Sequence, residues 1–154
     1  MTRIDFYHLQ KASVEDALPK LLEKAYATGK RILVKIGTEE RVEFLNTHLW
    51  SYDETSFLPH GSKKDGNASM QPIWLTSQDD NPNEATILFL VDCAKTDVEK
   101  THLFERILNI FDGNNQESLD WSRKFWKQLK SQGEECYYWQ QDDRGTWQQK
   151  DSPD

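Results

Sequence analysis

The strongest constraint on the fold is a set of uninterrupted apolar runs that alternate with amphipathic segments. Residues Lys30–Gly37 and Ala85–Asp92 are apolar nearly throughout, and the second run is the most apolar stretch of the chain. Strands without polar alternation are typical of parallel sheets, because such sheets are covered on both faces. We therefore expect Ala85–Asp92 to be the central strand of a parallel sheet.

Shorter segments extend this pattern. Further strands are expected at Ile4–Leu9, Pro72–Thr76 and Cys136–Gln140. Helices are expected after the capping residues Ser13 and Thr38, and over Val98–Phe111 and Glu117–Leu129, with Ser118 as a cap for the last. Pro19 falls inside the first helical segment, so we expect it in the first turn or a late helix start.

The alternation of strands and helices predicts the fold class and the domain organisation. Residues 1–150 should form one three-layer α/β domain, with a mainly parallel sheet and helices on both faces. A polar tail follows at 151–154. This arrangement is Rossmann-like, but the chain has no phosphate loop of either common glycine-rich type.

Composition and missing motifs exclude several classes of function. The net charge of −7 predicts that direct nucleic-acid binding is weak or absent. Without a nucleophile elbow, an H-x-x-x-H pair or a C-x-x-C pair, we expect no catalytic residue, no metal and no cofactor. The two cysteines, Cys93 and Cys136, suit a reducing compartment, and Cys93 is expected to be buried.

No apolar run approaches the length of a membrane span, and the first residues do not form a signal peptide. We therefore expect a cytoplasmic protein without a membrane partner. One enzymatic alternative stays open, because α/β domains bind ligands in the crevice at the carboxyl ends of their strands. A nucleotide-handling enzyme would be the natural member of that class.

Two clusters of residues are candidates for binding a partner. The first holds Trp50, Phe57, Leu58 and Pro59 in a connection with no helical or strand period, so the aromatic rings either pack under the domain or face a partner. The second holds Arg123, Lys124, Trp126 and Lys127 on the last helix.

In the second cluster Arg123 and Lys127 are one helical turn apart, with Trp126 beside them. Cations next to an aromatic ring suit an acidic peptide that ends in an apolar residue. The same cations could simply complement the helix dipole. A nucleic-acid patch is a third, weaker interpretation.

Taken in order along the chain, these motifs resemble the chi subunit family of bacterial DNA polymerase III holoenzyme. The residues that carry the resemblance are Phe6-Tyr7, Gly29-Lys30-Arg31-Ile32-Leu33, Leu49-Trp50, Ser56-Phe57-Leu58-Pro59-His60, Glu117-Ser118-Leu119, Arg123-x-x-Trp126-Lys127 and Trp147. The chain departs from the family in having Trp126 in place of a tyrosine and a longer connection at Asp112–Asn115.

The resemblance implies a non-enzymatic accessory subunit of the clamp loader. It implies a one-to-one pairing with the psi subunit through Trp50, Phe57, Leu58 and Pro59. It also implies that Arg123, Lys124, Trp126 and Lys127 bind the acidic C-terminal tail of single-stranded DNA-binding protein. Phe111 is expected as a second wall of the pocket for the last residue of that tail.

Overall fold

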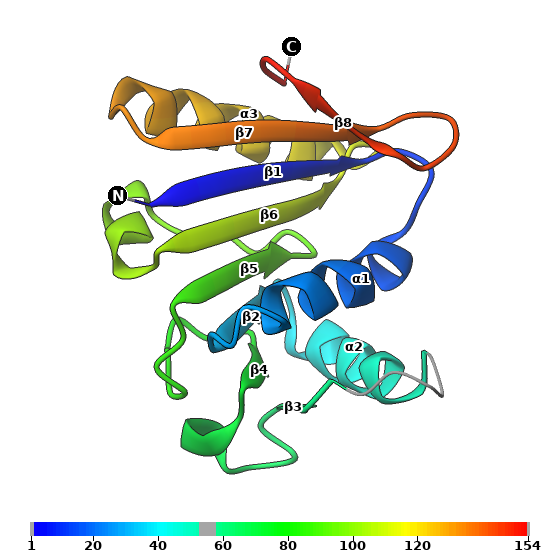
Figure 1. Ribbon diagram of the computed structural model, residues 1–154, viewed down its shortest axis with the longest axis vertical. Helices are drawn as coiled ribbons and strands as arrows, with labels where there is room; N and C mark the ends of the chain where they lie inside the picture. The colour runs from blue at the N-terminus through cyan, green and yellow to red at the C-terminus, as the bar shows by residue number, and fades with distance from the viewer. Residues whose placement is uncertain (1, 53–57, 154) are drawn as a thin grey trace.

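The computed structural model describes residues 2–52 and 58–153, and an eight-stranded sheet forms its centre (Figure 1). The strands follow the order β3-β4-β2-β5-β6-β1-β7-β8 across the sheet. They are β1 (Arg3–Leu9), β2 (Ile32–Ile36), β3 (His60–Gly61), β4 (Ile73–Thr76), β5 (Ile87–Val91), β6 (Arg106–Asp112), β7 (Glu135–Gln141) and β8 (Trp147–Lys150). Neighbouring strands are parallel except β7 and β8, which confirms the predicted sheet.

Within the described residues, three α-helices cover the two faces of this sheet, which makes a three-layer α/β fold. They are α1 (Val14–Tyr26), α2 (Glu39–Ser51) and α3 (Gln116–Ser131), with short 3-10 helices η1 (Ala68–Met70) and η2 (Val98–Leu103). Figure 1 shows α1 and α2 in front of the sheet and α3 behind it. Each face has its own buried core, one under α1 and α2 and one under α3.

The helix caps agree with the sequence for α1 and α2 but not for α3. Ser13 and Thr38 cap α1 and α2, because their hydroxyls accept the amides of Asp16 and Arg41. The cap of α3 is Asn115, whose side chain accepts the amide of Ser118. Ser118 was therefore the wrong cap, and the helix begins earlier than predicted.

The predicted helix over Val98–Phe111 was wrong. Its first part is η2, and its second part is strand β6, in which Ile107 faces the α3 core and Leu108 faces the α1 core. Because both faces of this strand are buried, its sequence lacks the polar alternation that marks a strand. Leu103, at the end of η2, is 61% exposed.

Two further expectations need correction. Pro19 lies beyond the first turn of α1 and is buried there, instead of starting the helix. Cys93 is exposed and adopts a φ of +66°, since it lies in the turn after β5 and not within the strand. The continuous apolar run before Cys93 made it look like part of the buried segment.

Candidate functional site

The first candidate site lies at the C-terminal end of α2. Val42, Leu45 and Leu49 of this helix are buried against the sheet, which turns the next residue, Trp50, outward. The side chain of Trp50 is 50% exposed. Its ring lies against that of His60, with 4.1 Å between the centroids and 32° between the ring planes.

His60 fixes the chain beneath Trp50. It is buried, its Nδ1 lies 2.6 Å from the Leu58 carbonyl oxygen, and its Nε2 lies 3.1 Å from the Asn46 carbonyl oxygen on α2. The imidazole therefore ties the segment at Leu58–His60 to the helix. Of the other predicted residues, Leu58 is buried and Pro59 is half-buried, while Phe57 lies outside the described residues.

A second set of hydrogen bonds holds the segment just after His60 to α2. The Asp65 carboxylate accepts the Ser62 amide and the Asn46 side-chain amide, each at 2.9 Å. The hydrogen bond from the Ser62 amide lowers the pKa of Asp65 most strongly, and the bond from Asn46 lowers it further. Trp50 thus rests on a chain segment that is held at two points.

The second candidate site is the basic helix α3. Lys124 and Lys127 are exposed, whereas Arg123 is half-buried and its Nε atom is fully covered. Arg123 lies close to His8, near the end of β1. Burial lowers the pKa of His8, and the positive charge of Arg123 lowers it further. A half-buried guanidinium binds an anion more strongly than a fully solvated one, since less water screens it.

The two predicted pocket walls, Trp126 and Phe111, lie in the core. Their side chains are 7% and 3% exposed, and both contact Tyr138, at centroid distances of 5.8 Å and 6.2 Å. Trp126 also meets Phe6 edge-on at 5.3 Å. The rings therefore lie in the core beneath α3, whereas Lys124 and Lys127 face solvent.

Sequence reasoning missed Trp121. This residue is partly exposed, stacks on Phe125 with centroids 4.7 Å apart, and lines a cavity of about 390 Å³ between α3 and η2 together with Lys124. Its place three residues before Lys124 was the available signal. Asp97 and Glu99 also line this cavity and would repel an acidic ligand. Lys124 therefore faces a different groove from the side of α3 that carries Arg123 and Lys127.

The crevice at the carboxyl ends of the strands is lined by three carboxylates, those of Glu15, Asp92 and Asp112, and by two cations, Lys11 and Arg41. Arg41 pairs there with Glu15 and, at 2.9 Å, with Asp92. At the start of α1 the Ser13 hydroxyl accepts the Asp16 amide, and Glu15 and Asp16 lie in the first turn. A phosphate group would meet these carboxylates, where a nucleotide-binding helix offers open amides.

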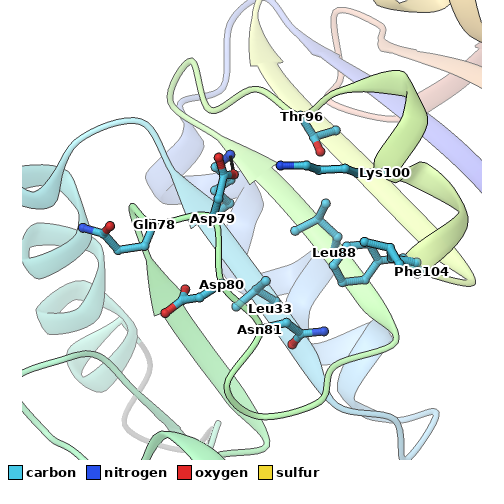
Figure 2. Close-up of a pocket in the computed structure, with 11 residues that line it drawn as sticks. Leu33, Gln78, Asp79, Asp80, Asn81, Leu88, Thr96, Lys100 and Phe104 are labelled. Atoms are coloured by element: carbon cyan, nitrogen blue, oxygen red, sulfur yellow. Dashed lines mark hydrogen bonds and ion pairs between the residues drawn. The ribbon is translucent and has the colours of Figure 1, made fainter.

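A smaller cavity of about 120 Å³ lies on the α3 face of the sheet, between the loops after β4 and β5 (Figure 2). Leu33, Leu88 and Phe104 form its apolar lining, and Lys35 pairs with Asp79 at its mouth. Figure 2 shows the Lys100 amine pointing toward Asp79 as well. Because Lys35 and Asp79 neutralise each other, the cavity is better suited to an apolar group than to an ion.

Comparison with known proteins identifies the family. The family model for the DNA polymerase III chi subunit, HolC, matches residues 1–136. The chain belongs to the DNA polymerase III chi subunit family. Membership confirms the resemblance seen in the sequence.

Two curated chi proteins are similar to this chain. A probable DNA polymerase III subunit chi of Rickettsia prowazekii is 31% identical over 111 residues, which cover 72% of this chain and 66% of that protein. The DNA polymerase III subunit chi of Pseudomonas aeruginosa is 33% identical over 63 residues, which cover 39% of this chain and 44% of that protein. The chain thus spans less than two thirds of the length of either relative. Within residues 2–52 and 58–153, no helix has the length and apolar content that crossing a bilayer requires.

Proposed function

We propose that the chain is a two-sided, non-catalytic adaptor of the replication machinery. One side binds the psi subunit of the clamp loader through Trp50, Phe57, Leu58 and Pro59. The other side binds the C-terminal tail of single-stranded DNA-binding protein through Arg123 and Lys127. The observation that carries this proposal is the placement of α2 and α3 on opposite faces of the sheet, which leaves room for both partners at once (Figure 1).

The psi side is supported by the exposure and rigidity of Trp50. A half-exposed tryptophan that is held on a buried ring loses little conformational entropy when a partner covers it. Phe57 follows in the same connection and adds a second large apolar side chain. Leu58 supports this surface indirectly, because its buried side chain anchors the segment that follows Phe57 in the sequence.

The tail side is supported by the pairing of a half-buried Arg123 with an exposed Lys127 one turn later. The guanidinium offers a bidentate contact to a terminal carboxylate, and the lysine adds a point charge. Exposed charge pairs contribute only about 0–1 kcal/mol each, so upstream acidic residues bind loosely. We expect a micromolar complex, about −8 kcal/mol, that weakens as salt rises.

The phenyl group of the tail would pack against the aromatic cluster under α3. Trp126 and Phe111 offer little open surface, so we propose contact at the outer edge of Trp126 beside Lys130, whose amine lies 5.7 Å from the ring centroid. Three carboxylates and two cations line the α/β crevice, and Arg41 is paired with Glu15 and Asp92, so a phosphate group would compete with these carboxylates, which argues against the enzymatic alternative.

A fluorescent acidic peptide that ends in Phe tests the tail side. Titration with Arg123→Ala or Lys127→Ala should give weaker binding than wild type, and Lys20→Ala, an exposed lysine on α1, serves as the matched control. The same peptide without its last Phe should bind far more weakly. Equal binding of the two peptides, or unchanged binding by both α3 variants, would contradict this assignment.

A further inference from the structure

The face of the sheet that carries α1 and α2 has two unlike halves (Figure 1). α1 and α2 lie over the part formed by β4, β2, β5 and the second half of β6, whose inward side chains are aliphatic apart from Phe89. These are Ile32, Val34, Ile36, Ile73, Leu75, Ile87, Phe89, Val91, Leu108 and Ile110. In the part of the chain that the structure describes, no helix lies over β1, β7 and β8 on this side.

The uncovered half carries aromatic, arginine and glutamine side chains instead. Strand residues two apart share a face, and the antiparallel register places Trp139 opposite Gln149 and Gln141 opposite Trp147. The side chains on this half are Arg3, Asp5, Tyr7, Leu9, Arg106, Glu135, Tyr137, Trp139, Gln141, Trp147 and Gln149. We call Tyr137, Trp139 and Trp147, which are all partly exposed, the aromatic platform.

Neighbouring side chains fix the rings of the platform. Tyr7 stacks on Trp139 with an interplanar angle of 13° and meets Trp147 edge-on, with centroids 5.0 Å apart. The indole nitrogen of Trp139 donates to the Asp5 carboxylate at 3.0 Å. The platform is therefore ordered before any ligand arrives.

Two arginines lie at one end of the platform. Arg3 and Arg106 both donate to the buried Asp5 carboxylate, at 3.0 Å and 3.1 Å, so one of the two positive charges is left uncompensated by Asp5. The Arg3 guanidinium lies 4.4 Å from the Tyr137 ring centroid. Glu135 lies beside it, since its carboxylate accepts the Tyr137 hydroxyl at 2.5 Å, and it offsets part of that charge.

We propose that this half of the sheet is a stacking platform for single-stranded DNA. Partner helices bury aliphatic side chains, as α1 and α2 do on the other half, whereas rings, guanidinium groups and amides suit planar bases. Bases would stack on the aromatic platform, Gln141 and Gln149 would meet their polar edges, and Arg3 and Arg106 would face a phosphate. The site does not depend on the adaptor function proposed above.

The contact is weak and sensitive to salt, because the chain as a whole carries −7. This is consistent with the expectation from composition that nucleic-acid binding is weak. Stacking supplies most of the binding, since every base has an aromatic face and the two arginines share the Asp5 carboxylate.

The test is fluorescence anisotropy of a labelled oligothymidine of about 12 nucleotides, titrated with the full chain at low salt. Tyr137→Ala and Trp147→Ala should each weaken binding about fivefold or more. Tyr137→Phe and Trp147→Phe keep a ring and should retain most of it. Glu135→Gln should tighten binding by up to about fivefold, because it removes the opposing charge. Phe44→Ala, a half-exposed aromatic on α2, is the control.

Three results would overturn the proposal. They are no binding by wild type at low salt, equal binding of a duplex of the same length, and unchanged binding by both alanine variants. A protein segment as the true occupant of this face would give the first or the third result. Circular dichroism checks the fold of each variant, and titration with the acidic tail peptide shows separately whether the α3 site is intact.

Discussion

The Nε2 atom of His48 lies 2.7 Å from the carbonyl oxygen of Glu15. In a regular helix the amide four residues later would bond to this carbonyl, but Pro19 stands there and has no amide hydrogen. His48 of α2 therefore supplies the donor that α1 lacks and joins the two helices that cover one face of the sheet.

This relationship predicts a coupled effect on stability. His48→Ala should lower the free energy of unfolding by about 1–3 kcal/mol, because it leaves a half-buried carbonyl without its donor. In a Pro19→Ala background the same change should cost less, since the substituted alanine donates its own amide. Urea denaturation of both single variants and the double variant measures the coupling. Strictly additive losses would show that the His48 bond does not replace the missing helix bond.

Acid should destabilise the protein partly through His8. Burial, helped by the positive charge of Arg123, lowers the pKa of His8 in the folded state. As the pH falls, His8 therefore takes up a proton in the unfolded chain before it does so in the folded chain. The stability that neutral His8 contributes is intact above about pH 6.5 and declines as the pH falls below that value. His8→Gln should show a shallower decline in urea midpoint between about pH 7.5 and pH 5.5. An equally steep decline in the variant would assign the effect to other groups.

The two cysteines should react at different rates. Cys93 is exposed, whereas burial raises the pKa of the Cys136 thiol to about 11. At about pH 8 almost no Cys136 thiolate is present, so a thiol reagent such as dithionitrobenzoate should modify one cysteine quickly and the other slowly. Cys93→Ser should remove the fast phase, and denaturant should merge the two phases. Two fast phases in the native protein would contradict the burial of Cys136.

Truncation of Trp50 should weaken psi binding without loss of stability. Large aromatics at the centre of an interface cost about 2 kcal/mol or more when truncated, which is more than tenfold in affinity. We expect Trp50→Ala and Phe57→Ala to lose at least tenfold in affinity for psi, with melting temperatures close to wild type. Phe44→Ala is the matched control, because Phe44 is also 50% exposed on α2 but points in another direction. Equal effects of Trp50→Ala and Phe44→Ala would remove the special role of Trp50.

The sequence was sufficient for the layered architecture, because β2 and β5 are apolar on both faces and the caps of α1 and α2 are local signals. It was not sufficient for β6. The spacing of Leu103, Phe104, Ile107, Leu108 and Phe111 fits a helix as well as a doubly buried strand. Only pairing with β1 and β5 decides between them, and that pairing joins residues far apart in the chain.

The candidate sites were predictable to different degrees. The exposure of Trp50 followed from the buried side of α2. The burial of Trp126 did not follow from α3 alone, because it depends on Phe6 and Tyr138, which come from β1 and β7. The aromatic platform was invisible for a similar reason, since it needs the register of β7 with β8.

The most direct test of the adaptor function is a bridging measurement. Psi is immobilised, the chain is added, and the capture of a fluorescent tail peptide of single-stranded DNA-binding protein is recorded. Wild type should capture the peptide on psi. Arg123→Ala with Lys127→Ala should bind psi but not the peptide, while Trp50→Ala should bind the peptide in solution but not psi. Competition between psi and the peptide for the wild-type chain, or loss of both partners in either variant, would contradict two separate sites on opposite faces of the sheet.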